Sequence, residues 1–110
     1  MIVIKRINHI LCIEINRPEK FNSFTKQMLD DLAKAYTTLE EEEDLRAGLV
    51  YAQGKHFSSG LDLADVSPYV LRGEPLTPSG LIDPFQTQGV FRKKPIVMAI
   101  QGYAFTLSIE

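Results

Sequence analysis

The stretch LVYAQGKHFSSGLDL, residues 49–63, joins a short apolar run to a turn and the start of a helix. Residues 49–52 predict a buried strand, because the apolar run is short and is followed by turn residues. Residues 53–56 predict the turn, and Asp62 can cap the helix that follows. A strand that leads through a turn into a helix is typical of α/β folds, so this stretch indicates the fold class.

Two strands and a helix precede this stretch. Residues 2–7 and 10–15 predict strands, and Asn8-His9 between them predict a tight antiparallel hairpin, because Asn tolerates a positive φ. Over residues 25–43, apolar side chains recur at spacings of three and four, which predicts a helix with one apolar stripe. The stripe consists of Met28, Leu29, Leu32, Ala35, Tyr36 and Leu39. A right-handed crossover through this helix would make the second strand parallel to residues 49–52.

The remainder of the sequence is less regular. Prolines and glycines predict a loop-rich segment over residues 67–79, followed by a short helix that ends at Arg92. Residues 95–100 predict a last strand, Gln101-Gly102 a turn, and residues 103–110 the start of a further helix. Strands that alternate with helices predict an α/β fold with a partly parallel sheet.

Composition excludes several classes of function. The 110 residues carry a formal net charge of -2, so no basic field indicates nucleic-acid binding. No apolar run approaches the roughly 20 residues that cross a membrane, and no signal-peptide pattern is present. The single cysteine, Cys12, cannot form an internal disulfide and is expected to be a buried thiol. We expect a cytoplasmic protein with no metal cluster and no membrane partner.

Chemistry is expected where two strands end. Residues 54–63 and 101–110 both run from a strand through a turn into a helix start. The first amides of a helix have no partner within that helix. Two such amides that converge form an oxyanion hole, which stabilises negative charge on a carbonyl or thioester oxygen. From spacing alone, two ordinary strand-to-helix turns remain the alternative.

Four blocks of sequence resemble the enoyl-CoA hydratase/isomerase (crotonase) family. They are NRPEKFNS at residues 16–23, DLRAGLVYAQG at 44–54, HFSSGLDL at 56–63 and KPIVMAIQGYA at 94–104. The blocks stand in family order and span nearly the whole chain. The resemblance implies an α/β crotonase-like (ClpP/crotonase) fold with a β-β-α spiral core, and an enzyme that acts on coenzyme A thioesters.

The resemblance implies catalytic roles for three residues. The amide of Leu61 matches the first oxyanion donor of the family, and the amide of Leu107 matches the second. Glu110 matches the first of two glutamates that position water and exchange a proton with the α-carbon of the substrate. A Glu110 without a catalytic role is the alternative, and Ser108 stands where family members often carry glycine.

Three further residues are implied in coenzyme A binding. Ser59 and Leu63 match the region that lines the adenine end of the site. Lys20 lies in a loop that approaches the phosphates in the family, where an ammonium group would supply positive charge. A solvated surface lysine is the alternative for Lys20. We expect no tightly bound cofactor, because the coenzyme A thioester is the substrate.

Side chains close to these blocks are expected to be structural. His56 stands at a position that varies widely in the family, so we expect it to have no catalytic role. Tyr103 and Phe105 are expected in the hydrophobic core. Asp62 is expected to cap the helix that follows Leu61.

Family members are more than twice as long as this sequence. We therefore expect residues 1–110 to form the N-terminal part of a crotonase-like domain, truncated before completion and at most weakly active alone. An intact protein is expected to bind acyl-CoA and to assemble as a homotrimer or hexamer. A non-catalytic module that binds coenzyme A or another subunit is the alternative. The sequence leaves open whether the reaction is hydration or isomerisation.

Overall fold

The computed structural model describes residues 1–84 and 92–105, which form four strands and two α-helices. In chain order the elements are β1 (Ile2–Ile7), β2 (Ile10–Ile15), a 3₁₀ turn (Pro18–Lys20), α1 (Lys26–Glu41), β3 (Ala47–Ala52), α2 (Leu63–Leu71) and β4 (Ile96–Met98). The sheet has the order β1-β2-β3-β4, with β1 antiparallel to β2 and the other pairs parallel. The predicted α/β fold with a partly parallel sheet is confirmed.

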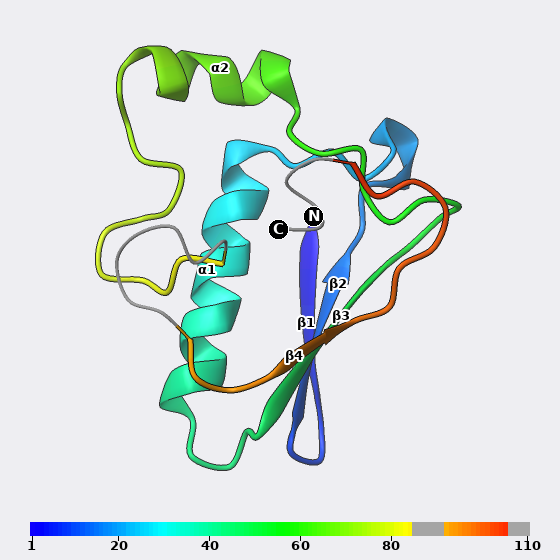
Figure 1. Cartoon of the computed structure of the whole chain (residues 1–110), viewed down its shortest axis with the longest axis vertical. Coiled ribbons are helices and arrows are strands. Elements are labelled where there is room, and N and C mark those ends of the chain that lie inside the picture. Colours follow the sequence, from blue (N-terminus) through cyan, green and yellow to red (C-terminus); the bar gives the residue numbers. More distant parts are fainter. Residues whose placement is uncertain (85–91, 106–110) are drawn as a thin grey trace.

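The helix α1 covers one face of the sheet, and α2 lies beyond the N-terminal end of α1 (Figure 1). Leu11, Ile13 and Ile15 point toward α1, because side chains alternate between the two faces of a strand. All six residues of the predicted apolar stripe are buried in the same core. The hairpin is also confirmed, and Asn8 in its turn has a φ of 55°.

Both ends of α1 are stabilised by polar contacts. At the start, the Thr25 hydroxyl accepts a hydrogen bond from the Met28 amide at 3.1 Å. At the end, the Lys94 ammonium donates to the carbonyls of Leu39 and Glu42, both at 2.7 Å. A cation is favourable there because the last carbonyls of a helix carry partial negative charge. Lys94 thereby joins the fourth sequence block to α1.

The helix α2 is longer than the sequence predicted. It continues through Pro68 to Leu71, whereas a loop was expected from residue 67. Proline removes its own amide hydrogen bond and crowds the carbonyl four residues earlier, and the helix ends three residues after Pro68. The Asp62 cap at the start of α2 and the buried side chain of Val66 hold the helix in place.

Residues 76–84, which follow α2, pass alongside α1 (Figure 1). Ile82 is buried in the core, and its amide donates to the Thr37 hydroxyl at 2.9 Å. The predicted short helix falls mainly on residues 85–91, which lie outside the described residues, and residues 81–84 are not helical. The strand β4 is three residues long, which is shorter than predicted. Within residues 1–84 and 92–105, no helix has the length and apolar character needed to cross a membrane.

Candidate active site

The amide of Leu61 lies where the third sequence block pairs with Phe24, the residue that follows the first block. The Phe24 amide donates to the Gly60 carbonyl at 2.7 Å, and the Asp62 amide donates to the Phe24 carbonyl at 2.8 Å. Successive amides in an extended segment point to opposite sides, so the Leu61 N–H points away from Phe24. The part of the chain that the structure describes supplies no acceptor for it. A free amide in a fixed position is what an oxyanion donor requires.

Asn22 holds the first block against the turn that follows β3. Its side chain is buried, and its Oδ1 accepts a hydrogen bond from the Arg17 amide at 2.7 Å. Its Nδ2 donates to the carbonyls of Gln53 and His56, at 2.6 and 2.8 Å. Three backbone groups from two loops are satisfied by one amide side chain, so Asn22 fixes these loops relative to each other.

Ser58 supports the same loop from within. Its buried hydroxyl donates to the Asn22 carbonyl at 2.7 Å and accepts from the Gly60 amide at 3.1 Å. Gly60 has a φ of 96°, a conformation that a side chain would strain. Between Ser58 and Gly60, the amide of Ser59 donates a hydrogen bond to the Phe21 carbonyl at 3.0 Å. These contacts place the Ser-Ser-Gly sequence directly against the first block.

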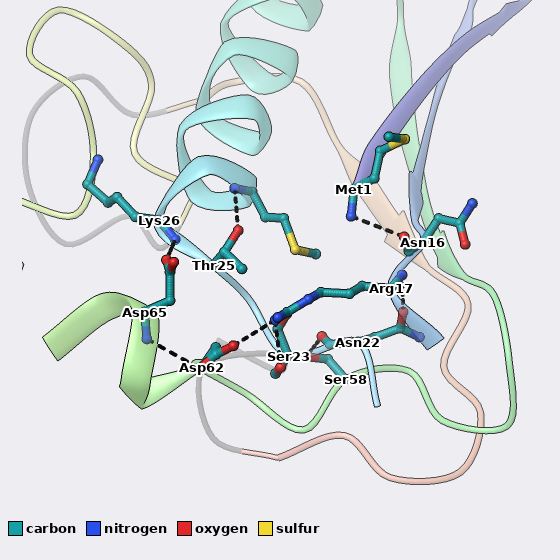
Figure 2. Close-up of polar contacts among 11 residues, drawn as sticks. Met1, Asn16, Arg17, Asn22, Ser23, Thr25, Lys26, Ser58, Asp62 and Asp65 are labelled. Carbon is teal, nitrogen blue, oxygen red and sulfur yellow. Dashed lines mark hydrogen bonds and ion pairs between the residues drawn. The ribbon is translucent and has the colours of Figure 1, made fainter. Parts of the chain in front are cut away.

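Arg17 and Asp62 form an ion pair beside this loop (Figure 2). Nη1 of Arg17 lies 2.9 Å from Oδ2 of Asp62, and it also donates to the carbonyl and the hydroxyl of Ser23. Oδ1 of Asp62 accepts a hydrogen bond from the Asp65 amide at 3.3 Å, which confirms the predicted helix cap. The hydrogen bond from Arg17, followed by that from the Asp65 amide, lowers the pKa of the Asp62 carboxyl below its usual value of 3.8.

This pKa predicts an acid-dependent loss of stability. A carboxyl whose pKa is lower in the folded than in the unfolded state stabilises the fold above its unfolded pKa. That contribution is lost as the pH falls through the folded pKa, so the free energy of unfolding should drop below about pH 4. Urea unfolding across a pH series should show a shallower drop for Asp62→Asn. The exposed Asp44 provides a control, and Asp44→Asn should keep the wild-type profile. Identical profiles for Asp62→Asn and wild type would contradict this prediction.

The turn after β4 lies against the turn after β3. The Phe57 amide donates to the Gln101 carbonyl at 2.7 Å, and the Ser58 amide donates to the Tyr103 carbonyl at 3.1 Å. The Tyr103 amide donates to Nδ1 of His56 at 2.9 Å, and the rings of these two residues stack with centroids 4.1 Å apart. Residues 101–103 of the second segment that the sequence analysis singled out are therefore adjacent to the first segment.

Tyr103 and Phe105 are not in the core, contrary to expectation. They are 55% and 50% exposed, and their rings stack with centroids 5.0 Å apart. The cause is that the chain from 103 to 105 is extended and bridges to Ser58, instead of starting a helix. Side chains alternate along an extended segment, so Ala104 faces the core and its two neighbours face outward.

The structure places the other predicted site residues as follows. Leu107 and Glu110 lie outside the described residues. Ser59 is half-buried, whereas Lys20 and Leu63 are exposed, Lys20 at the end of the 3₁₀ turn and Leu63 at the start of α2. Among residues 1–84 and 92–105, no cluster of three or more His, Cys, Asp or Glu side chains could hold a metal ion.

Comparison with known proteins identifies the family. The family model described as enoyl-CoA hydratase/isomerase matches residues 5–107. The chain belongs to the enoyl-CoA hydratase/isomerase family. The probable peroxisomal enoyl-CoA hydratase 1 of Arabidopsis thaliana is 36% identical over 96% of this chain and 38% of its own length. The mitochondrial Delta(3,5)-Delta(2,4)-dienoyl-CoA isomerase of Mus musculus is 33% identical over 86% of this chain and 32% of its own length.

A solved structure supports the same assignment. The crystal structure of a probable enoyl-CoA hydratase/isomerase from Mycobacterium abscessus superposes with a TM-score of 0.90 and 42% identity. It covers 98% of this chain, which spans 41% of that protein. The predicted crotonase-like fold and the resemblance to the N-terminal part of the family are thereby confirmed. The chain spans less than half the length of these relatives. The relatives named above include peroxisomal and mitochondrial proteins, so a cytoplasmic location stays a prediction.

Proposed function

We propose that the complete protein binds an acyl-CoA thioester and polarises its carbonyl between the amides of Leu61 and Leu107. The observation that supports this proposal is the Leu61 N–H, which is held by backbone bonds on both sides and has no acceptor among the described residues. As the α-carbon of the substrate becomes enolate-like, negative charge moves onto the thioester oxygen, where such donors stabilise it. Glu110 would exchange the proton with the α-carbon.

Two reactions share this step. In hydration, water adds across the α,β double bond, with hydroxide on the β-carbon and a proton on the α-carbon. In isomerisation, a proton leaves one carbon and returns to another while the double bond moves. Both reactions place negative charge on the thioester oxygen, so the Leu61 amide serves either one. The proposal therefore covers hydration or isomerisation of an enoyl-CoA.

The proposal includes a binding site for coenzyme A. Lys20 is exposed on the 3₁₀ turn, where its ammonium would contact the phosphates. Ser59 and Leu63 flank the Leu61 amide in sequence and would line the adenine end. A homotrimer or hexamer in the cytoplasm is the assembly that we propose for the complete protein.

Turnover by the protein expressed from its complete reading frame tests this function. We expect it to hydrate crotonyl-CoA, or to isomerise a longer enoyl-CoA, at roughly 1–10³ s⁻¹, the usual range for enzymes. The measurement follows the absorbance of the conjugated thioester, and thermal unfolding with free coenzyme A measures binding separately. Binding without turnover of any enoyl-CoA would indicate a non-catalytic coenzyme A module. A complete protein that shows no binding of coenzyme A and no turnover of any enoyl-CoA would refute the proposal.

A further inference from the structure

The guanidinium of Arg17 connects the first and third sequence blocks. Its partner Asp62 is 45 residues away in the sequence, and the two side chains are only 19% and 22% exposed. By comparison, the side chains of the ion pair Arg72–Glu74 are 58% and 50% exposed. Solvent screens a partly buried ion pair less than an exposed one, so the Arg17 pair can hold its geometry more firmly.

Arg17 is itself fixed at both ends. Its amide donates to Oδ1 of the buried Asn22 at 2.7 Å. Its Nη1 donates to the carbonyl and hydroxyl of Ser23, at 3.1 and 3.0 Å, as well as to Asp62. Figure 2 shows the side chain of Arg17 extended toward Ser23 and Asp62. The guanidinium therefore contacts Asp62 from a residue whose backbone and side chain are both fixed by other hydrogen bonds.

Asp62 passes this constraint to the Leu61 amide. The Asp62 carboxylate uses one oxygen for Arg17 and the other for the Asp65 amide, so rotation of this group would break both contacts. Asp65 in turn accepts a hydrogen bond from the Lys26 amide at 2.7 Å, which joins the starts of α1 and α2. On the other side of Leu61 stands Gly60, which has a φ of 96° that a side chain would strain, and whose amide donates to the Ser58 hydroxyl at 3.1 Å. The Gly60 carbonyl, which belongs to the same peptide group as the Leu61 amide, accepts a hydrogen bond from the Phe24 amide at 2.7 Å. The orientation of the Leu61 amide thus depends on this backbone bond on one side and on Asp62 on the other.

We propose that Arg17, acting through Asp62, is a positioning residue for the Leu61 amide. The inference rests on the proposed function of that amide as an oxyanion donor. A donor must lie within hydrogen-bond reach of the developing charge, and small misplacements lower the rate strongly while leaving remote binding contacts intact. Loss of Arg17 should therefore change kcat more than KM.

The test compares Arg17→Lys with Arg72→Lys in the complete protein. Lysine keeps the charge but, as a single ammonium on a flexible stem, does not reproduce the three contacts of the guanidinium. We expect Arg17→Lys to lower kcat roughly 10- to 100-fold with KM changed less than about threefold. The carbonyl stretching frequency of a bound enoyl thioester should move toward its value in water. Arg72→Lys alters an exposed pair and should leave all three quantities unchanged.

A measurement without turnover separates this inference from the proposed function. In protein labelled with ¹⁵N-leucine, the Leu61 amide signal should shift in Arg17→Lys and in Asp62→Asn, whereas the signal of the core residue Leu11 should not. If wild type acts on no enoyl-CoA, the proposed function fails and the Leu61 signal still decides the positioning role.

An unmoved Leu61 signal in both variants would overturn the inference. So would a lower melting temperature with unchanged kcat and carbonyl frequency, because that result indicates stabilisation alone. Asp62→Asn keeps a side-chain oxygen for the helix cap, and it is the variant to measure if Arg17→Lys does not fold.

Discussion

Replacing Leu61 by proline is expected to lower kcat of the complete protein roughly 10²- to 10³-fold, because proline has no amide hydrogen to donate. The loss corresponds to about 3–4 kcal/mol of transition-state stabilisation, which is typical for one oxyanion donor. The affinity for coenzyme A should change less than kcat, since the substitution removes one donor to the thioester oxygen and leaves the side chains of Ser59 and Leu63 unchanged. Steady-state kinetics with crotonyl-CoA, at saturating and limiting concentrations, would measure both quantities.

Leu61→Ala is the matched control for this variant. Alanine keeps the amide hydrogen and removes most of the side chain, which is half-buried against the core. We expect Leu61→Ala to lose stability but to keep kcat within about tenfold of wild type. The residue before this proline, Gly60, has no Cβ to clash with the ring. Near wild-type turnover by folded Leu61→Pro, or an equal loss in both variants, would refute the assignment of the amide.

The fold was predictable where local periodicity and tertiary packing agree. Alternate residues of β2 and the residues spaced by three and four in α1 each form an apolar face, and the two faces meet in the same core. Prediction failed where the two disagree. Pro68 favours a break in the chain, but the Asp62 cap and the buried Val66 keep α2 intact beyond it. Tyr103 and Phe105 are apolar enough for a core, yet the pairing of their segment with Ser58 directs them outward.

The candidate site, like the fold, was predictable only in part. The resemblance of HFSSGLDL to the family singles out the Leu61 amide, whose role as an oxyanion donor stays a prediction. The supporting side chains were not predictable, since Arg17 and Asn22 act on partners 31 to 45 residues away in the sequence. Likewise, the role of His56 as an acceptor for the Tyr103 amide depends on two turns that meet only in the folded chain. A weak signal was present, because the polar residues Arg17 and Asn22 lie in an irregular loop that leads into the amphipathic helix α1.

Gly102→Ala is expected to destabilise the protein by about 4 kcal/mol, a large effect for one methyl group. A Cβ at this position would lie 2.3 Å from the Lys55 carbonyl oxygen and 2.4 Å from Nδ1 of His56. The Lys55 carbonyl is backbone, so it cannot move without shifting the turn after β3. The φ of 58° at Gly102 adds the strain of a left-handed conformation. Urea unfolding would measure the change in the free energy of unfolding.

Gly73→Ala separates these two causes. Gly73 has a φ of 73°, but no atom lies within 4 Å of its ideal Cβ, so this variant should show only the left-handed strain of roughly 1–2 kcal/mol. The difference between the two variants then measures the close approach of the turns after β3 and β4. Because that approach allows the Tyr103 amide to reach His56, Gly102→Ala should also lower kcat, whereas Gly73→Ala should not. Equal destabilisation by the two variants would mean that the turns are not packed together, and the candidate active site would lose one of its two sides.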